Sequence, residues 1–271
     1  MRIGTHEFNT KENTYVMGIL NVTPDSFSDG GKINGIDAAL KKAEEMKGDG
    51  AAIIDVGGES TRPGYTPVSE EEEMDRVLPV IEAIKSRIDI PISVDTYKSK
   101  VAEAAIYAGA DLINDIWGLK ADPRMAEVIA KHKVACCLMH NRNNTEYQNF
   151  VEDMLADMNE SVILAKKAGI AEDKIILDPG VGFAKTYEQN LIAVRELETL
   201  TKLGYPVLLG TSRKSVIGLT LDLPSDQRLE GTLVTTVVAV ENGCGFVRVH
   251  DVKENYRAIQ MANAIYKRNI K

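Results

Sequence analysis

Short apolar runs alternate with longer amphipathic stretches along the whole chain. The apolar runs are continuous, which is typical of parallel strands covered by helices on both faces. Runs of this kind predict strands at residues 15–20, 52–56, 90–94, 112–113, 134–139, 175–177, 205–209 and 246–249. The stretches between them are long enough for helices, so the pattern indicates a chain built from repeated βα units.

Helical periodicity supports this interpretation. Apolar residues three and four apart predict helices at 36–47, 70–87, 148–168, 228–242 and 251–268. Two residue pairs have the spacing of capping boxes at helix starts: Ser69 with Glu72, and Thr186 with Gln189. Gly169 is a signal for a helix end. The four glutamates at 70–73 are expected to be solvated in a first helical turn, where they complement the helix dipole.

The number of units predicts the fold. Eight βα units in about 250 residues is the count of a (β/α)8 TIM barrel, so we predict a single α/β domain over residues 1–271. Residues 1–14 are expected to be a short N-terminal extension that covers the base of a barrel at 15–271. A doubly wound open sheet is the alternative, but the first βα loop lacks the G-x-G-x-x-G pattern of dinucleotide folds.

Composition narrows the class of partner. The chain has 271 residues and a net charge of -8, which opposes binding to nucleic acid or to an anionic membrane. It shows no apolar run long enough to span a bilayer and no signal-peptide core at its start. Its three cysteines have no C-x-x-C spacing and indicate a reducing compartment. We therefore expect a cytoplasmic protein that acts on small molecules.

Polar side chains stand where the predicted strands end, and in a TIM barrel that edge carries the active site. Asp95, Asn114 and Asp178 form one group of hydrogen-bond acceptors. A carboxylate accepts two parallel hydrogen bonds from an amidine-like edge of adjacent N–H groups. The group therefore favours a planar nitrogen heterocycle as ligand.

A second group at the strand ends is cationic: Lys214, Arg248 and His250. Arg248 and His250 are two residues apart on a strand, so both side chains point to the same face. A buried arginine needs an anionic partner, and we expect this pair to hold a phosphate. Opposite it, the loop from Asn21 to Gly31 offers hard oxygens at Asn21, Asp25 and Asp29 that suit Mg2+ shared with the phosphate.

The chain has no G-x-S-x-G, H-E-x-x-H or Walker A sequence. The expected chemistry is therefore displacement of a phosphorylated leaving group, driven by positioning and charge stabilisation instead of covalent catalysis.

Four long motifs resemble the bacterial dihydropteroate synthases: NVTPDSFSDGG at 21–31, IDVGGESTRP at 54–63, DPGVGF at 178–183 and SRKS at 212–215. The resemblance runs from about residue 2 to the last helix and includes Arg248-Val249-His250. It implies a TIM barrel, usually a homodimer, that requires Mg2+. The implied reaction joins 6-hydroxymethyl-7,8-dihydropterin diphosphate to p-aminobenzoate and gives 7,8-dihydropteroate and pyrophosphate, a step that sulfonamides block by competing for the aminobenzoate pocket.

The resemblance also implies residue roles. The pterin would be held by Asp95, Asn114, Met139, Asp178, Phe183 and Lys214. The diphosphate would be held by Asn21, Arg248 and His250, and the metal by Asn21 and Asp29. The aminobenzoate would be held by Phe27, Thr61, Arg62, Pro63 and Ser215. The catalytic set would be Asp95, Asp178, Lys214, Arg62 and Asp29.

Two other functions remain open at this point. A pterin-binding methyltransferase acting on a methyltetrahydrofolate would share the pterin acceptors, but it would not need the loops at 24–31 and 60–63. A non-catalytic paralogue that only holds a pterin would not need Arg62, Lys214, Arg248 and His250, all of which are present.

Overall fold

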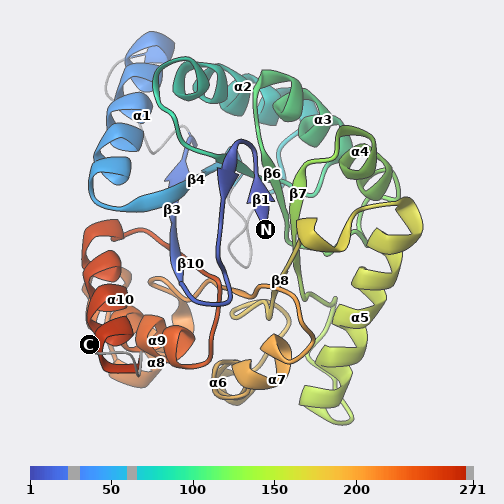
Figure 1. Ribbon diagram of the computed structural model, residues 1–271, viewed down its shortest axis with the longest axis vertical. Coiled ribbons are helices and arrows are strands. Elements are labelled where there is room, and N and C mark those ends of the chain that lie inside the picture. Colours follow the sequence, from blue (N-terminus) through green and yellow to red (C-terminus); the bar gives the residue numbers. More distant parts are fainter. Residues whose placement is uncertain (24–30, 60–65, 267–271) are drawn as a thin grey trace.

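The computed structural model describes residues 1–23, 31–59 and 66–266. In this part of the chain, eight parallel strands form one sheet in the order β8-β7-β6-β5-β4-β3-β10-β9, with helices around it (Figure 1). The strands are β3 (Tyr15–Asn21), β4 (Ala51–Gly57), β5 (Ile92–Asp95), β6 (Leu112–Asp115), β7 (Ala135–Met139), β8 (Ile175–Asp178), β9 (Leu208–Leu209) and β10 (Phe246–Val249).

The sheet curls until its two edge strands meet. Leu177 of β8 forms a parallel bridge with Val207, the residue before β9. The predicted TIM barrel is therefore confirmed, and the open-sheet alternative is wrong.

The helices follow the strands in the expected alternation. They are α1 (Gly31–Gly48), α2 (Glu70–Arg87), α3 (Ser99–Ala108), α4 (Met125–His132), α5 (Phe150–Ala168), α6 (Tyr187–Arg195), α7 (Leu197–Thr201), α8 (Ser215–Leu221), α9 (Leu229–Glu241) and α10 (Val252–Tyr266), with short 3-10 turns at Glu172–Lys174 and Ser225–Gln227. The capping box at Thr186 and Gln189 is present, and Gly169 ends α5 in the left-handed conformation. None of the helices in the described ranges is long and apolar enough to cross a bilayer.

Successive strand residues face two different cores. Val16 packs in the large core between the sheet and the helices, whereas its neighbour Met17 packs inside the barrel. The interior core is built from the beginnings of the strands, so it fills the base of the barrel. The opposite end of the barrel, where the strands finish, is where polar side chains collect.

The N-terminal extension closes the base. Its hairpin pairs β1 (Arg2–Ile3) with β2 (His6–Glu7), and Figure 1 shows the N-terminus over the middle of the barrel. Ile3 and Phe8 belong to the interior core, and the Phe8 ring lies 5.0 Å from that of Tyr15 and 5.6 Å from that of Phe246. The extension therefore completes the core and lies far from the strand ends.

Two local expectations are corrected. Strand β9 is shorter than the predicted 205–209, because Pro206 has no N–H to donate to a neighbouring strand. Glu73 is not solvated: it is 1% exposed, and its carboxylate lies 2.7 Å from Lys98 Nζ. Burial raises the pKa of Glu73, and the Lys98 ammonium opposes that rise.

Candidate active site

The predicted acceptors lie on neighbouring strands at one rim. The register pairs Asp95 of β5 with Asn114 of β6, and Met139 of β7 with Asp178 of β8. Asn21 ends β3 at the same rim. Parallel strands in register bring residues that are far apart in the sequence to one level of the barrel, so the acceptor group converges as predicted.

Arg248 joins this group at its centre. Its Nε donates to Asp55 Oδ2 at 2.6 Å, and one of its terminal nitrogens donates to Asp95 Oδ2 at 2.8 Å. Asn114 Nδ2 lies 3.5 Å from the same Asp55 oxygen. Burial alone would lower the pKa of Arg248, but the carboxylates of Asp55 and Asp95 outweigh it and hold the pKa above its usual range. The anionic partner that a buried arginine needs is thus supplied by the protein itself.

Three buried polar side-chain atoms of the cluster are not hydrogen-bonded within the described part of the protein. Asp55 Oδ1, Asp95 Oδ1 and Ser93 Oγ have no hydrogen-bond partner among the described residues. Burial raises the pKa of Asp95 to about 7, with the charge of Asp55 adding to the rise and that of Arg248 opposing it. Buried polar atoms are normally hydrogen-bonded, so the unpaired Oδ1 of Asp95 fits a ligand that brings an N–H donor.

Asp178, Lys214 and Arg248 converge on one point of the rim. A side-chain carbon placed on Gly210 would lie 3.8 Å from Asp178 Oδ2, 3.9 Å from Lys214 Nζ and 3.9 Å from Arg248 Cβ. The acidic and the cationic groups predicted from the sequence therefore meet at a single place. Gly210 leaves that place open because it has no side chain.

The loop after β8 shapes the surroundings of Asp178 and Lys214. Asp178 Oδ1 accepts from the N–H of Gly180 at 2.7 Å, and Lys214 Nζ donates to the carbonyl oxygen of Val181 at 2.5 Å. The Lys214 ammonium also lies 4.9 Å from the centre of the Phe183 ring. Burial lowers the pKa of Lys214 to about 8, and the Asp178 carboxylate opposes that fall.

His250 and Ser215 lie on the eighth and seventh units. His250 follows β10, and its Nδ1 lies 3.0 Å from Ser212 Oγ, which also accepts from the His250 N–H at 3.1 Å. Ser215 is exposed at the first turn of α8. The remaining predicted residues, Asp25, Phe27, Asp29, Thr61, Arg62 and Pro63, lie outside the described residues.

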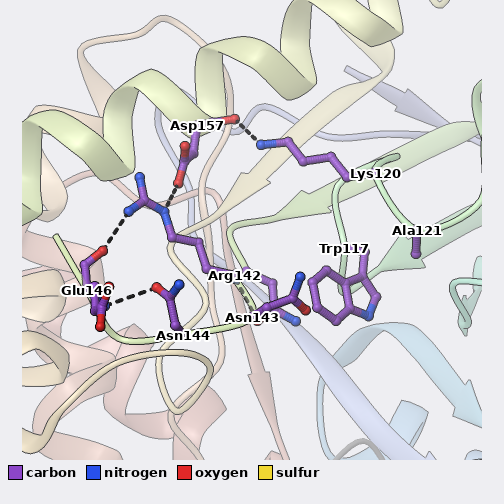
Figure 2. A pocket seen from close by; sticks show the side chains of 9 residues that line it. Trp117, Lys120, Ala121, Arg142, Asn143, Asn144, Glu146 and Asp157 are labelled. Atoms are coloured by element: carbon purple, nitrogen blue, oxygen red, sulfur yellow. Dashed lines mark hydrogen bonds and ion pairs between the residues drawn. The ribbon is translucent and has the colours of Figure 1, made fainter.

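An open cavity of about 620 Å³ lies beside the rim, between the loops that follow β6 and β7. Figure 2 shows Trp117, Lys120 and Arg142 among its lining residues, with the Arg142 guanidinium bound to the Asp157 carboxylate at 2.5 Å. Lys120 Nζ donates to the Asp157 carbonyl oxygen at 3.0 Å. These cations are therefore already paired inside the protein, and the cavity is not lined by the predicted acceptors.

Sequence reasoning left two buried groups without a role. Asp55 lies in a strand that is otherwise apolar, and a buried charge of that kind signals a partner, which is Arg248. Lys185 follows the DPGVGF motif and is buried, and the sequence gives no signal for its partners. Asp115, by contrast, caps a turn: it accepts from the N–H groups of Trp117 and Leu119 at 2.9 and 2.7 Å.

Comparison with known proteins agrees with this geometry. The family described as pterin binding enzyme matches residues 17–250. A dihydropteroate synthase of Clostridium beijerinckii is 63% identical over 99% of this chain and 100% of its own length. A dihydropteroate synthase of Bacillus subtilis is 58% identical over 94% of this chain and 90% of its own length.

Solved structures are similar over nearly the whole chain. A dihydropteroate synthase of Clostridium difficile, crystallised in the presence of pteroic acid, is 51% identical with a TM-score of 0.94, over 97% of this chain and 100% of its own. The Yersinia pestis dihydropteroate synthase in complex with a sulfonamide drug is 41% identical with a TM-score of 0.92, over 98% of this chain and 99% of its own.

Proposed function

The chain belongs to the dihydropteroate synthases within the pterin-binding enzyme family, and we propose that it joins 6-hydroxymethyl-7,8-dihydropterin diphosphate to p-aminobenzoate, with release of pyrophosphate. A member of this family is an enzyme, a transferase of folate synthesis. The observation that carries the proposal is the convergence of Asp178, Lys214 and Arg248 around Gly210, because it sets acceptors and cations side by side.

The acceptor group holds the pterin. Asp95 and Asp178 accept from the N–H groups along the ring edge, with Asn114 beside them. The unpaired Asp95 Oδ1 supports this role, since a ring N–H would satisfy it. Met139 and Phe183 pack on the ring, and Lys214 binds its carbonyl oxygen. The contact between the Lys214 ammonium and the Phe183 ring supports that arrangement.

Arg248, His250 and Asn21 hold the diphosphate. A guanidinium has five N–H donors, so the two carboxylate contacts of Arg248 do not exhaust it. Mg2+ fits this end of the rim, because Asn21 offers an amide oxygen there and magnesium in proteins takes few side-chain ligands beside phosphate oxygens. Asn21 and Asp29 would hold the ion, which when bound neutralises charge on the leaving diphosphate.

The reaction is dissociative. Pyrophosphate leaves from the exocyclic methylene, and Arg248 and His250 stabilise its charge. The carboxylates of Asp95 and Asp178 favour the cation left on the pterin. The neutral arylamine of p-aminobenzoate then attacks the methylene carbon and afterwards loses its extra proton to solvent, so no strong base is needed.

The aminobenzoate is held by Ser215, at the exposed first turn of α8, together with Phe27, Thr61, Arg62 and Pro63. Sulfonamides compete for the same pocket, which the sulfonamide complex of the Yersinia pestis relative supports.

The protein works as a cytoplasmic homodimer. All three cysteines are free and buried, which supports a reducing compartment. Exposed apolar side chains on the last three described helices, Leu219 of α8, Val234 of α9 and Met261 of α10, support a second copy as the partner. These helices are neighbours on one side of the barrel (Figure 1).

Measurement of pyrophosphate release tests the function. With pterin diphosphate and Mg2+, release should depend on added p-aminobenzoate. Asp178→Asn should lower kcat/KM about a hundredfold or more, because it removes a charge aimed at the developing cation. Asp49→Asn, at an exposed acid, is the matched control and should leave kcat/KM unchanged. The proposal would be contradicted if pyrophosphate were released at the same rate without p-aminobenzoate, or if Asp178→Asn kept the kcat/KM of the parent enzyme.

A further inference from the structure

Lys185 is a buried cation without a role in the reaction described above. It follows the loop after β8 and is 9% exposed. Its Nζ donates to the carbonyl oxygens of Gly180 at 2.9 Å and Phe183 at 3.0 Å, and lies 2.8 Å from His140 Nδ1. An ammonium has three N–H donors and no acceptor, so these three contacts use its full hydrogen-bonding capacity.

The loop between Asp178 and Lys185 is strongly bent. Gly180, Gly182 and Ala184 all have positive φ, at 67°, 89° and 44°. A side-chain carbon on Gly180 would lie 1.9 Å from the His140 carbonyl oxygen, so the loop lies directly against the end of β7. Bends of this kind turn backbone carbonyls inward, and buried carbonyls need donors. Lys185 donates to two of them, those of Gly180 and Phe183, and the Gly180 carbonyl oxygen also accepts from the Phe183 N–H at 3.1 Å.

The same loop arranges the pterin side of the rim. It begins at Asp178, whose carboxylate is held by the Gly180 N–H. Its Val181 carbonyl oxygen receives the Lys214 ammonium, and its Phe183 ring lies against that ammonium. Lys185 binds the carbonyl oxygens of Gly180 and Phe183, which flank Val181 in the sequence. A shift of the loop would therefore move the Phe183 ring and the Val181 carbonyl that binds Lys214 together.

A chain of side chains anchors Lys185 from the other side. Because the ammonium can only donate, His140 Nδ1 accepts, and the proton of the imidazole is on Nε2, which donates to Asp157 Oδ2 at 3.0 Å. Arg142 binds the same Asp157 oxygen (Figure 2). Burial and the nearby Lys185 charge lower the pKa of His140 to about 3, so the ring stays a neutral acceptor.

The three contacts of Lys185 Nζ call for the ammonium form, and its surroundings oppose that charge. Burial lowers its pKa to about 7, and the Asp178 carboxylate opposes that fall, while Lys214 adds to it. The groups that face it are thus His140 in direct contact, with Asp178, Asp157, Lys214 and Arg142 farther off. A buried ammonium that is fully hydrogen-bonded fixes its partners in place, because leaving any of them unpaired costs free energy.

We propose that Lys185 is a positioning residue of the pterin site, in which it ties the loop of residues 178–184 to His140 and so fixes the places of Asp178, Phe183 and Lys214. The proposal rests on the assignment of the pterin to Asp178 and Lys214. It predicts that loss of the Lys185 ammonium weakens use of the pterin diphosphate and spares use of p-aminobenzoate.

The main test is Lys185→Met, which keeps the length of the side chain and removes its donors. The KM for pterin diphosphate should rise about tenfold or more, as expected from loss of hydrogen bonds to buried carbonyls, while the KM for p-aminobenzoate stays within about twofold. Lys120→Met is the matched control, since Lys120 contacts the Asp157 backbone from the cavity side and does not touch the loop. Its KM values should equal those of the parent enzyme.

Two substitutions of His140 test the same role independently, and they can be measured even if Lys185→Met does not fold. Asparagine places an amide oxygen near the position of Nδ1, so His140→Asn keeps an acceptor for Lys185, whereas His140→Leu removes it. The KM for pterin diphosphate should stay near the parent value in His140→Asn and rise in His140→Leu. Equal values in the two variants would overturn the proposal, as would a Lys185→Met enzyme whose two KM values are unchanged or rise equally.

Asp178→Asn distinguishes an error in the role of Lys185 from an error in the proposed function. If Asp178→Asn leaves kcat/KM for pterin diphosphate unchanged, the assignment of the pterin to this loop is wrong, and the positioning role falls with it. If Asp178→Asn impairs pterin use and Lys185→Met does not, only the positioning role is overturned.

Discussion

At the scale of single residues, the rim is a compact set of buried charges. Arg248 binds Asp55 and Asp95, so one cation faces two acids. Buried ion pairs of this kind contribute little net stability, because desolvation offsets their attraction. Their effect is instead to hold an acidic group in place with one oxygen unpaired, which suits Asp95 for a ligand.

The raised pKa of Asp95 predicts that the free energy of unfolding depends on pH. Between its ordinary value of 3.8 and about 7, the folded protein binds this proton and the unfolded chain does not. Folding stability therefore falls as the pH rises through that window. Asp95→Asn removes the titration, so its unfolding free energy relative to the parent should increase from pH 4 to pH 7 and level off above pH 7.

Urea denaturation at a series of pH values measures this difference. Ser93→Ala is the control, because it alters a buried, non-titrating neighbour on the same strand. Its difference from the parent should be the same at every pH. A pH-independent difference for Asp95→Asn would show that Asp95 is not protonated in this window.

At the scale of elements, the N-terminal hairpin is part of the barrel core. Phe8 is 5% exposed and packs on Tyr15 and Phe246 at the base. Stability and chemistry are therefore located at opposite ends of the strands, as is usual for this fold.

Phe8→Ala should lower stability without changing catalysis. Loss of a buried ring should lower the unfolding free energy by about 3–5 kcal/mol, while kcat of the protein that remains folded stays at the parent value, because the base does not touch the rim. Tyr107→Ala, at a residue that is 72% exposed and whose ring contacts the edge of the core through His132 at 5.0 Å, should change stability by no more than about 1.5 kcal/mol. Thermal unfolding and kinetics on the same samples provide the check, and a fall in kcat that parallels the loss of stability would contradict the separation.

At the scale of the whole molecule, large apolar side chains are exposed on the last helices of the barrel. Val234 and Met261 are each 63% exposed, on the adjacent helices α9 and α10. Exposed apolar side chains on neighbouring helices are typical of protein–protein interfaces, and a symmetric dimer would bury the same surface of each copy.

For the proposed homodimer, Val234→Arg should shift the mass from dimer to monomer in sedimentation equilibrium, because the dimer would bury the new charge without a partner. Tyr107→Arg places the same charge on α3, a helix in another part of the barrel, and should leave the mass unchanged. A parent protein that is already monomeric would refute the dimer.

The barrel and most of its strands were predictable because each rests on a local pattern. Continuous apolar runs identify covered parallel strands wherever they occur. Some predictions fail because a distant contact decides the outcome, and others because a proline or a short element interrupts the local pattern. Glu73 has the sequence of a solvated first turn, yet it is buried and forms an ion pair with Lys98 from the next βα unit. Strand β9 is shortened by Pro206, and α3 and α4 are too short for the pattern to delimit them.

The sequence by itself determined the fold, the family and the rim positions of Asp95, Asn114, Asp178, Lys214 and Arg248, since strand ends in a parallel barrel share one edge. Only the tertiary structure decided which of these groups are bonded to one another. It paired Arg248 with Asp55, left one oxygen of Asp95 unpaired, and placed Lys185 between His140 and the loop after β8. The physical reason is that hydrogen bonds act over about 3 Å, whereas Arg248 is 193 residues from Asp55 and Lys185 is 45 residues from His140 along the chain.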